Sequence, residues 1–285
     1  MAEAHQAIER NYDRPDLGAT ILAALKQAGK DVERLTPDDL AAVDEFHTGQ
    51  RGATIRLAEL LHLRGSERVV DVGCGIGVPS RFLAKQYGCR VSGLDLTSGF
   101  VRVAGMLAHL TGLSALVDYR QGDALNMPFA DQIFDIVWCQ NVSMNVANRP
   151  ALYAEMFRVL KPDGQLAIQD VVAGSGGPPF YPLSWAREPN ISFLITAEET
   201  RDKLERAGFR TTTWMDTTKT SLEEVQARAK VAKTGSPSPL GQRLRHDKPQ
   251  YVTQSRRRKD RSFERGLEAY PLKTALGHSR QFGDV

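Results

Sequence analysis

The chain has 285 residues, of which 41% are hydrophobic and 25% charged, as in an ordinary globular protein. No apolar run approaches the ~20 residues of a membrane span, and the first residues lack the charged start and apolar core of a signal peptide. We therefore expect a cytoplasmic protein that does not enter the membrane. The three cysteines, without a CxxC pair, indicate neither a disulfide framework nor a zinc site.

The net charge of +3 is unevenly distributed along the chain. Residues 241–285 contain 11 Lys/Arg and 5 Asp/Glu, a balance of +6, so the preceding 240 residues carry −3. We interpret residues 236–285 as a basic, poorly ordered C-terminal tail rather than as a nucleic-acid surface built into the fold. A nucleic-acid-binding or RNA-modifying protein that uses this tail is the alternative from another class. If the chain acts on small molecules, deletion of residues 241–285 should leave turnover largely intact.

Residues 1–50 precede the first predicted strand and indicate a helical cap over a ligand site. The stretch from Asn11 to Pro15 is typical of a loop, and residues 17–28 are typical of a short amphipathic helix that ends near Gly29. Residues 53–61 repeat apolar side chains at helical spacing. The first strand follows this helix.

From residue 68 the pattern alternates between strand and helix. The predicted strands cover residues 68–72, 90–94, 115–120, 134–139, 165–172 and 209–215, and the predicted helices cover 79–87, 98–110, 150–160, 196–207 and 221–232. This order predicts an α/β fold with a doubly wound, mostly parallel sheet, in a domain over residues 51–235. Residues 173–195 interrupt the alternation with a Gly/Pro-rich stretch. We interpret it as a lid insertion, because loops of this length are usually functional.

The first strand runs directly into a glycine turn at Gly73, Gly75 and Gly77. Small residues after a buried strand let a ligand approach the backbone, which indicates a nucleotide-type site. The spacing does not match a dinucleotide fingerprint, which needs a glycine where Val78 stands, and no Gly-Lys-Ser/Thr of a phosphate-binding loop follows. Hydride transfer and phosphoryl transfer are therefore disfavoured.

The stretch from Asp71 to Gly77 resembles the first motif of the class I methyltransferases that use S-adenosylmethionine (SAM). The turn from Lys161 to Gly164 also resembles that family. Asp95 ends the second strand, where its two carboxylate oxygens are placed to accept hydrogen bonds from ribose hydroxyls. The resemblance implies a SAM-dependent methyltransferase with a Rossmann-like fold and with SAM as its cofactor.

The resemblance also implies which residues contact the cofactor. Asp123 resembles the family's acidic residue beside the adenine amino group, with the Ala124 amide completing that contact. Gln140 resembles a position whose backbone contacts the methionine portion. The full set of cofactor candidates is Gln50, Arg51, Asp71, Gly73, Gly75, Gly77, Asp95, Leu96, Asp123, Ala124 and Gln140.

Within this class, four segments resemble the small-molecule methyltransferases that include sarcosine/dimethylglycine N-methyltransferases: residues 44–51, 145–148, 182–185 and 193–196. The resemblance implies a small-molecule methyl acceptor of the glycine-derivative type, whose amine nitrogen displaces the methyl group in line. C- or O-methylation of a quinone precursor or another secondary metabolite is the alternative within the class. The family closes its sheet with a final antiparallel strand, but no alternating apolar strand is evident after residue 241.

The acceptor-side candidates flank the expected cofactor mouth. His47, Tyr12 and Asn145 are candidate catalytic residues, with His47 as a base. Tyr181 and Trp185 are candidates for an aromatic wall against a cationic methylated amine. These residues come from the cap, the segment after the fourth strand and the lid.

The cofactor's carboxylate is predicted to be gripped by Gln50 and Arg51, the latter through its fork of donors. No metal is expected, because a sulfonium is already an activated methyl donor and because Gln140 and Asn141 lack the paired carboxylate of a catechol-type site. The sequence leaves the oligomeric state open, with a homodimer as one outcome.

Overall fold

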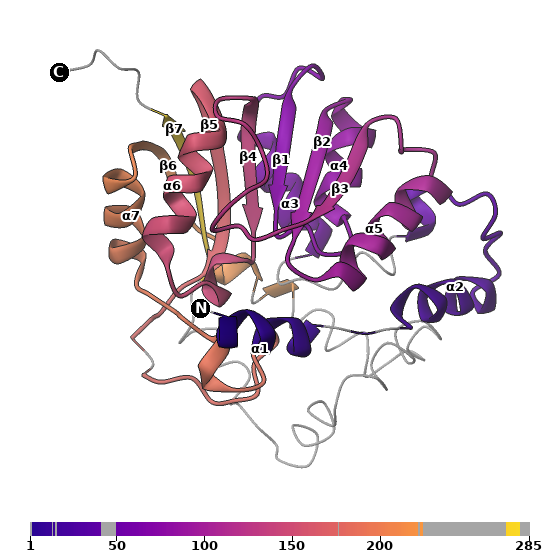
Figure 1. Cartoon of the computed structure of the whole chain (residues 1–285), viewed down its shortest axis with the longest axis horizontal. Helices are drawn as coiled ribbons and strands as arrows, with labels where there is room; N and C mark the ends of the chain where they lie inside the picture. The colour runs from indigo at the N-terminus through magenta and orange to yellow at the C-terminus, as the bar shows by residue number, and fades with distance from the viewer. Residues whose placement is uncertain are drawn as a thin grey trace.

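The computed structural model describes residues 2–12, 14, 16–40, 50–175, 177–221, 223–224 and 272–279. These residues form a twisted seven-stranded sheet with helices packed on both faces (Figure 1). The strands are β1 (Arg68–Val72), β2 (Arg90–Asp95), β3 (Val117–Gln121), β4 (Phe134–Gln140), β5 (Leu160–Val171), β6 (Phe209–Asp216) and β7 (Leu272–Ser279). The helices are α1 (Ala2–Tyr12), α2 (Leu17–Gln27), α3 (Gln50–Glu59), α4 (Val78–Tyr87), α5 (Ser98–Leu110), α6 (Arg149–Val159) and α7 (Ala197–Arg206), with 3-10 helices η1 (Pro37–Leu40), η2 (Ser143–Asn145) and η3 (Pro189–Ile191).

The strands are ordered β3-β2-β1-β4-β5-β7-β6. The strands from β3 to β5 pair in parallel, and β7 runs antiparallel to both of its neighbours. Strand order reverses between β1 and β4, and ligands of open α/β sheets bind beyond the carboxyl ends of the strands at such a point. The predicted doubly wound α/β fold is confirmed.

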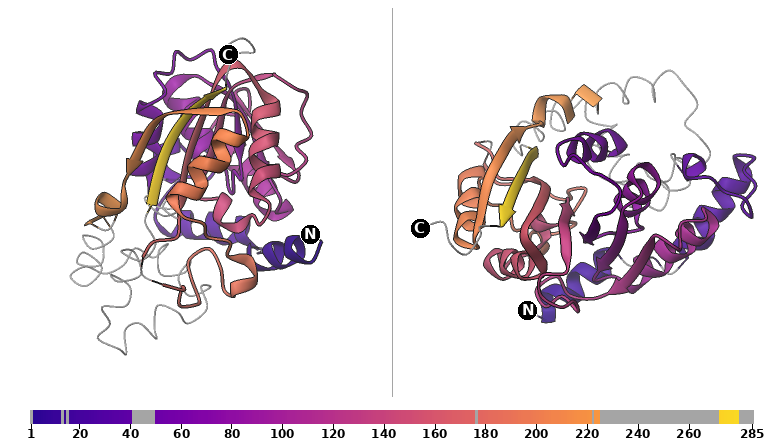
Figure 2. Two further views of the ribbon diagram at one scale, coloured as in Figure 1. Left: turned by 90° about the vertical axis from the view of Figure 1, so that its left-hand side faces the viewer. Right: turned by 90° about the horizontal axis from the view of Figure 1, so that it is seen from above.

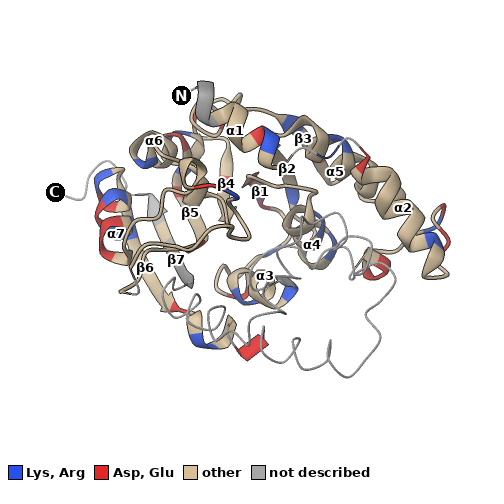
Figure 3. Cartoon of the chain, turned by 90° about the horizontal axis from the view of Figure 1, so that it is seen from below, with Lys and Arg blue, Asp and Glu red and all other residues tan. Residues whose placement is uncertain are grey.

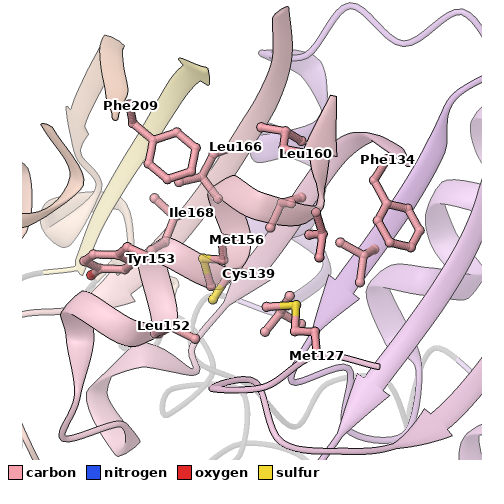
Figure 4. Close-up of a cluster of buried hydrophobic side chains, with 14 of the residues drawn as sticks. Met127, Phe134, Cys139, Leu152, Tyr153, Met156, Leu160, Leu166, Ile168 and Phe209 are labelled. Carbon is pink, nitrogen blue, oxygen red and sulfur yellow. The ribbon is translucent and has the colours of Figure 1, made fainter. Parts of the chain in front are cut away.

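Alternating side chains of the strands fill a core on each face of the sheet. Val70 and Val72 of β1 join the core beneath α6, together with Val137 of β4, whereas Val69 and Ile136 pack with α3 and α4. Figure 4 shows the first of these cores, in which side chains of α6 lie over β4 and β5. Because both faces are buried at the centre of the sheet, β1 and β4 are mostly apolar in sequence, whereas β3 and β6 are largely polar.

The sequence pattern shows no convincing strand after residue 241 and leaves open whether the family's final strand exists; the structure forms it as β7 (Leu272–Ser279), within the segment interpreted as a poorly ordered tail. β7 pairs along its length with β5 on one side and with β6 on the other. Figure 2 shows it (yellow) between these two strands. Deletion of residues 241–285 would remove a strand from within the sheet, and for that reason it is not a neutral test of the tail. The other residues of 236–285 lie outside the described residues.

Two further boundaries differ from the predictions. α1 continues to Tyr12, through the beginning of the segment assigned to a loop. β5 begins at Leu160, and the predicted turn at 161–164 is a bulge within it, with Asp163 at φ 61°. Most of the helix predicted over 221–232 lies outside the described residues. None of the helices in the described part of the chain has the length and hydropathy of a membrane span.

The lid (residues 173–195) leaves the sheet after β5 and returns at α7. The amide of Ala173 donates to the carbonyl of Ile195 (2.8 Å), so a hydrogen bond joins the two ends of this segment. The capping box at the start of α7 is present as predicted: the Glu199 amide donates to Thr196 Oγ1 (3.1 Å), and the Thr196 amide donates to Glu199 Oε2 (2.7 Å). The lid and α1 lie together at the edge where the parallel strands end (Figure 1).

Candidate active site

The glycine turn that follows β1 has three residues with positive φ: Gly73 (+70°), Gly75 (+54°) and Gly77 (+80°). Side chains other than glycine rarely adopt this left-handed region. A Cβ at Gly73 would overlap the side chain of Val142, and one at Gly77 would overlap that of Tyr119. A Cβ at Gly75 would meet no atom within 4 Å. Gly75 is therefore the position where the backbone faces open space and a ligand can approach it.

Asp95, the last residue of β2, is joined to this turn. Its Oδ2 accepts a hydrogen bond from the Gly75 amide (2.8 Å), and its Oδ1 accepts one from the Thr97 amide (2.8 Å). Burial raises the pKa of the Asp95 carboxyl, against the opposing effect of these hydrogen bonds. The Thr97 hydroxyl also binds this carboxylate. Because a carboxylate has about four lone-pair sites, Asp95 retains acceptor capacity for a hydroxyl of a ligand.

A cavity of about 280 Å³ lies next to Thr97, between α1 and the beginning of α5. Its lining residues are Gln6, Glu9, Arg10, Thr97 and Ser98. Because the Thr97 amide also binds Asp95 (2.8 Å), this cavity belongs to the same end of the sheet as the glycine turn.

Asp71 supports the turn from within the protein. Its buried carboxylate accepts a hydrogen bond from Ser80 Oγ of α4 (2.6 Å). Burial raises the pKa of Asp71 to about 7, with the Ser80 hydroxyl opposing the shift and the Asp95 carboxylate adding to it. The buried Arg81 donates to the Ile76 carbonyl (2.5 Å). These contacts fasten α4 to the turn, and a direct contact between Asp71 and the cofactor stays a prediction.

Asp123, in the loop after β3, lies beneath α1. Its Oδ1 accepts a hydrogen bond from the Leu125 amide (2.8 Å), and His5 Nε2 of α1 lies 3.7 Å from its Oδ2. In the loop after β2, the Leu96 carbonyl accepts a hydrogen bond from Gln121 Nε2 (3.1 Å). α1 therefore extends over the loops to which the sequence assigns the adenosine part of the cofactor.

Gln140 and Ala124 are directed into the protein. The buried side chain of Gln140 accepts a hydrogen bond from Thr54 Oγ1 (3.1 Å) and donates one to Gln169 Oε1 (2.7 Å). Ala124 packs against the core beneath α6. Because these side chains are used internally, any contact with a ligand would involve backbone groups, in line with the backbone contacts that the resemblance implies for both residues.

Of the two residues predicted to bind the cofactor's carboxylate, the structure describes the side chain of Arg51 only. Arg51 is 45% exposed, and its Nη1 lies 3.3 Å from Asp38 Oδ1 of η1. Gln50 begins α3, but its side chain lies outside the described residues, as does the whole of His47. The roles assigned to these three residues stay predictions.

Three of the predicted acceptor-side residues, from distant parts of the chain, contact one another. The Tyr12 hydroxyl lies 3.0 Å from both Asn145 Oδ1 and the Trp185 carbonyl and donates to them. Asn145 Nδ2 donates to the carbonyls of Trp185 (3.0 Å) and Ile191 (2.7 Å). This network joins α1, η2 and the lid, at the edge that Figure 3 shows from below.

The two aromatic residues of the lid differ in their exposure. The Trp185 ring is almost fully buried, and its Nε1 donates to Ser192 Oγ (3.1 Å). Tyr181 is half-buried and packs against the same lid cluster. Trp185 therefore contributes its carbonyl to this network, and the role of either ring as an aromatic wall stays a prediction.

The Tyr12 hydroxyl is in negatively charged surroundings. Burial raises the pKa of Tyr12, and the carboxylates of Asp95 and Asp170 raise it further. Burial also raises the pKa of Asp170, to about 7, against the opposing effect of Arg149. Because a tyrosinate is disfavoured here at neutral pH, Tyr12 is suited to donate hydrogen bonds and is unsuited to act as a base.

Arg149 and Asp170 are buried residues beside the site that the sequence analysis does not single out. Arg149 Nη1 lies 3.6 Å from Asp170 Oδ2, and the two side chains are 4% and 5% exposed. Two features of the sequence could have pointed to this pair. Asp170 is an acidic residue at the end of an apolar strand, and Arg149 is an arginine in the first turn of a helix, where the helix dipole disfavours a cation.

The glycine turn after β1, the carboxylate that ends β2 and the parallel sheet with antiparallel β7 define the class I SAM-dependent methyltransferase fold. Residues 70–168 match the family described as a methyltransferase domain. The chain therefore carries a domain of this family, and its cofactor is SAM. The open space at Gly75 and the two acceptor oxygens of Asp95 fit the backbone approach and hydroxyls of such a nucleoside. Among the described residues, no group of His, Cys, Asp and Glu is arranged to hold a metal ion.

The chain is 29% identical over 179 residues to phosphoethanolamine N-methyltransferase of Triticum aestivum, which covers 63% of this chain and 35% of that protein. Its fold is similar to geranyl diphosphate C-methyltransferase from Streptomyces coelicolor A3(2), with a TM-score of 0.67, 17% identity and 97% of each chain covered. It is also similar to a sarcosine dimethylglycine methyltransferase homologue from Galdieria sulphuraria, with a TM-score of 0.62, 17% identity, and 92% of this chain and 98% of that chain covered.

The first curated relatives are matched over only 25% to 49% of their own lengths. The structural matches described above, at 17% identity, support the fold alone. These relatives include proteins named for methylation of nitrogen and of carbon, so the comparisons leave the acceptor atom open.

Proposed function

We propose that the protein transfers the methyl group of SAM to the amine nitrogen of a small molecule by direct in-line displacement. SAM supplies an activated methyl group, so the tasks left to the protein are to orient the acceptor and to exclude water. The observation that carries the choice of nitrogen is the charge around the Tyr12 hydroxyl, whose pKa is raised by burial and by the carboxylates of Asp95 and Asp170.

This charge distribution favours an amine over a phenol or an enol. An amine attacks through its neutral lone pair and becomes a cation, which nearby carboxylates stabilise. A phenol or an enol must first lose a proton, and the carboxylates that raise the pKa of Tyr12 would raise the pKa of such an acceptor as well. Among acceptors that carry an ionisable proton, the charge around Tyr12 therefore favours an amine over a phenol or an enol; it does not distinguish an amine from an alkene carbon, which also becomes a cation.

Each residue of the site has a role in this proposal. Gly75 and Asp95 hold the nucleoside part of SAM, and Tyr12 and Asn145 form the wall that orients the acceptor. Tyr181 supplies an aromatic face for the methylated cation. Because Tyr12 donates its proton to protein acceptors, its oxygen retains a lone pair for an N–H of the acceptor.

C- or O-methylation is the second candidate. It is supported by the solved structure named as a geranyl diphosphate C-methyltransferase, which is similar over 97% of this chain. Methylation of a nucleic acid through the basic segment 241–271 is a third candidate, from another class. That segment lies outside the described residues, so only a direct assay separates this candidate from the others.

A screen with methyl-labelled SAM tests the proposal. The acceptors are glycine, sarcosine, dimethylglycine and phosphoethanolamine, compared with geranyl diphosphate, a hydroquinone and total RNA. We expect label in methylated amines, at a rate that rises with pH until the acceptor nitrogen has lost its proton. Label confined to carbon, oxygen or RNA would refute methylation of nitrogen. Gly75→Ala is the control, because it alters the cofactor site and leaves the acceptor wall unchanged.

A further inference from the structure

A single buried arginine contacts several of the segments around the acceptor wall. Arg149 is the first residue of α6, and its side chain is 4% exposed. Its Nε donates to the Val146 carbonyl (3.0 Å), its Nη2 donates to the Phe193 carbonyl (3.1 Å) and its Nη1 donates to the Tyr153 hydroxyl (3.2 Å). The guanidinium thus contacts the end of η2, the lid and α6.

Asp170, at the end of β5, provides the opposite charge. Its Oδ2 lies 3.6 Å from Arg149 Nη1. Burial raises the pKa of its carboxyl, and Arg149 opposes that shift, as do the backbone amides of Met144 and Ser143 at the beginning of η2. Arg149 binds the other end of the same turn through the Val146 carbonyl (3.0 Å). The pair therefore lies beside the short helix that carries Asn145.

η2 is also joined directly to the lid. The amide of Phe193 donates to the Met144 carbonyl (2.8 Å), and Asn145 Nδ2 donates to the Ile191 carbonyl (2.7 Å). Arg149 binds the carbonyl of the same Phe193 (3.1 Å), so it completes the junction at the point where the lid meets η2. The acceptor wall depends on this junction, because Asn145 in turn binds Tyr12 (3.0 Å).

Helix formation does not explain an arginine at this position. A cation in the first turn opposes the helix dipole, and burial penalises its charge further. Arg158, near the end of the same helix, is 30% exposed and has the dipole in its favour. The contacts of Arg149 with η2, the lid and Asp170 are what offset its unfavourable location.

We propose that Arg149 is a positioning residue for methyl transfer: with Asp170 as its counter-charge, it holds the lid on η2 and so fixes the acceptor wall formed by Tyr12 and Asn145. The catalytic part of this proposal rests on the proposed function, since it takes that wall to bind the acceptor. The structural part, that the guanidinium holds the lid, does not depend on which acceptor is used.

Amide hydrogen exchange of the full chain with S-adenosylhomocysteine (SAH) bound tests the proposal. In Arg149→Met, exchange of the lid amides, including Phe193, should be roughly tenfold faster, while exchange in β1 and β4 is unchanged. SAH affinity, measured by calorimetry, should stay within about twofold of wild type because the cofactor side is untouched. Arg158→Met is the matched control: Arg158 donates to the carbonyls of Phe129 (2.8 Å) and Met127 (3.1 Å), in the loop before β4, and its loss should leave lid exchange unchanged.

Arg149→Lys keeps a charge beside Asp170 but replaces the planar fork with one ammonium group, so lid exchange should be intermediate. This variant carries the test if the Met variant does not fold. With any acceptor identified by the screen, both variants should raise the KM for the acceptor more than they weaken SAH binding. Unchanged lid exchange in both Arg149 variants, or equally faster exchange throughout the domain in the Arg149 and Arg158 variants, would overturn the proposal. Because exchange and SAH binding need no turnover, these outcomes are distinct from a failure to find an amine acceptor.

Discussion

Replacement of Gly75 by alanine separates the cost of backbone strain from the cost of blocking the cofactor. Gly75 has a φ of +54°, and a Cβ there would meet no protein atom within 4 Å. The variant therefore incurs only the strain of a left-handed L-residue, ~1 to 2 kcal/mol. If SAM lies against this residue, the added methyl group must displace it or shift the amide that binds Asp95 (2.8 Å). Loss of such a charge-assisted hydrogen bond is worth ~1.5 to 3 kcal/mol, or roughly a tenfold to hundredfold loss of affinity.

The matched control is Gly112→Ala, just after the end of α5. Gly112 has a φ of +70°, and a Cβ there would also meet nothing within 4 Å. Urea titrations should give both variants a similar loss of stability, and calorimetry with SAH should show a loss of affinity only for Gly75→Ala. Wild-type affinity in Gly75→Ala, or an equal loss of affinity in the two variants, would refute the placement of the cofactor at Gly75.

The carboxylates and the phenol of the site give three more predictions. Asp95→Asn should weaken SAH binding by about tenfold or more, because a charged acceptor of hydrogen bonds is lost; unchanged affinity by calorimetry would remove Asp95 from the site. Tyr12→Phe should lower the rate of methyl transfer and leave SAH affinity nearly unchanged, because it removes the hydroxyl that joins α1 to the lid; steady-state kinetics would contradict this if only the KM for SAM changed. Asp71, with a pKa raised by burial to about 7, binds its proton more tightly in the folded than in the unfolded state, so its contribution to stability falls as the pH rises from about 4 to 7, by up to ~1.4 kcal/mol per pH unit. Asp71→Asn retains an acceptor for Ser80 and should flatten that part of the stability profile in urea titrations, whereas parallel profiles of the two proteins would contradict the shift.

Most of the fold is predictable from the sequence because its signals are local. β1 and β4 are short, mostly apolar runs, β2 ends at Asp95 and β3 is followed by Gly122, and the observed ends of these four strands fall within two residues of the predicted ones. β7 (Leu272–Ser279) has no such signal. Burial is described for only two of its residues, Ala275 and Gly277, both buried, and its backbone is a strand because β5 and β6 supply hydrogen bonds on both sides. Pairing with strands far away in sequence cannot be read from a local pattern.

The cofactor side of the site is likewise more predictable than the acceptor side. The glycine turn and Asp95 are adjacent to strand ends, so topology alone brings them together. The contact between Tyr12 and Asn145 depends on how α1 and the lid fold over the sheet, which no periodicity specifies. No sequence pattern marks Arg149 as a site residue. It donates hydrogen bonds to the carbonyls of Val146 and Phe193, and only the three-dimensional structure places these carbonyls around it.

Because β7 lies between β5 and β6, the sheet cannot be completed until the last part of the chain has been synthesised. β5 and β6 leave the ribosome first, yet β7 separates them in the finished sheet. While residues 217–271 are being translated, roughly 3 to 11 seconds at ~5–20 residues per second, β5 offers an unpaired edge and β6 has no strand to join. Unpaired edges invite association with other chains. A nascent chain of this protein therefore needs protection during that interval, and a premature stop codon before residue 272 would produce an aggregation-prone open sheet rather than a shortened enzyme.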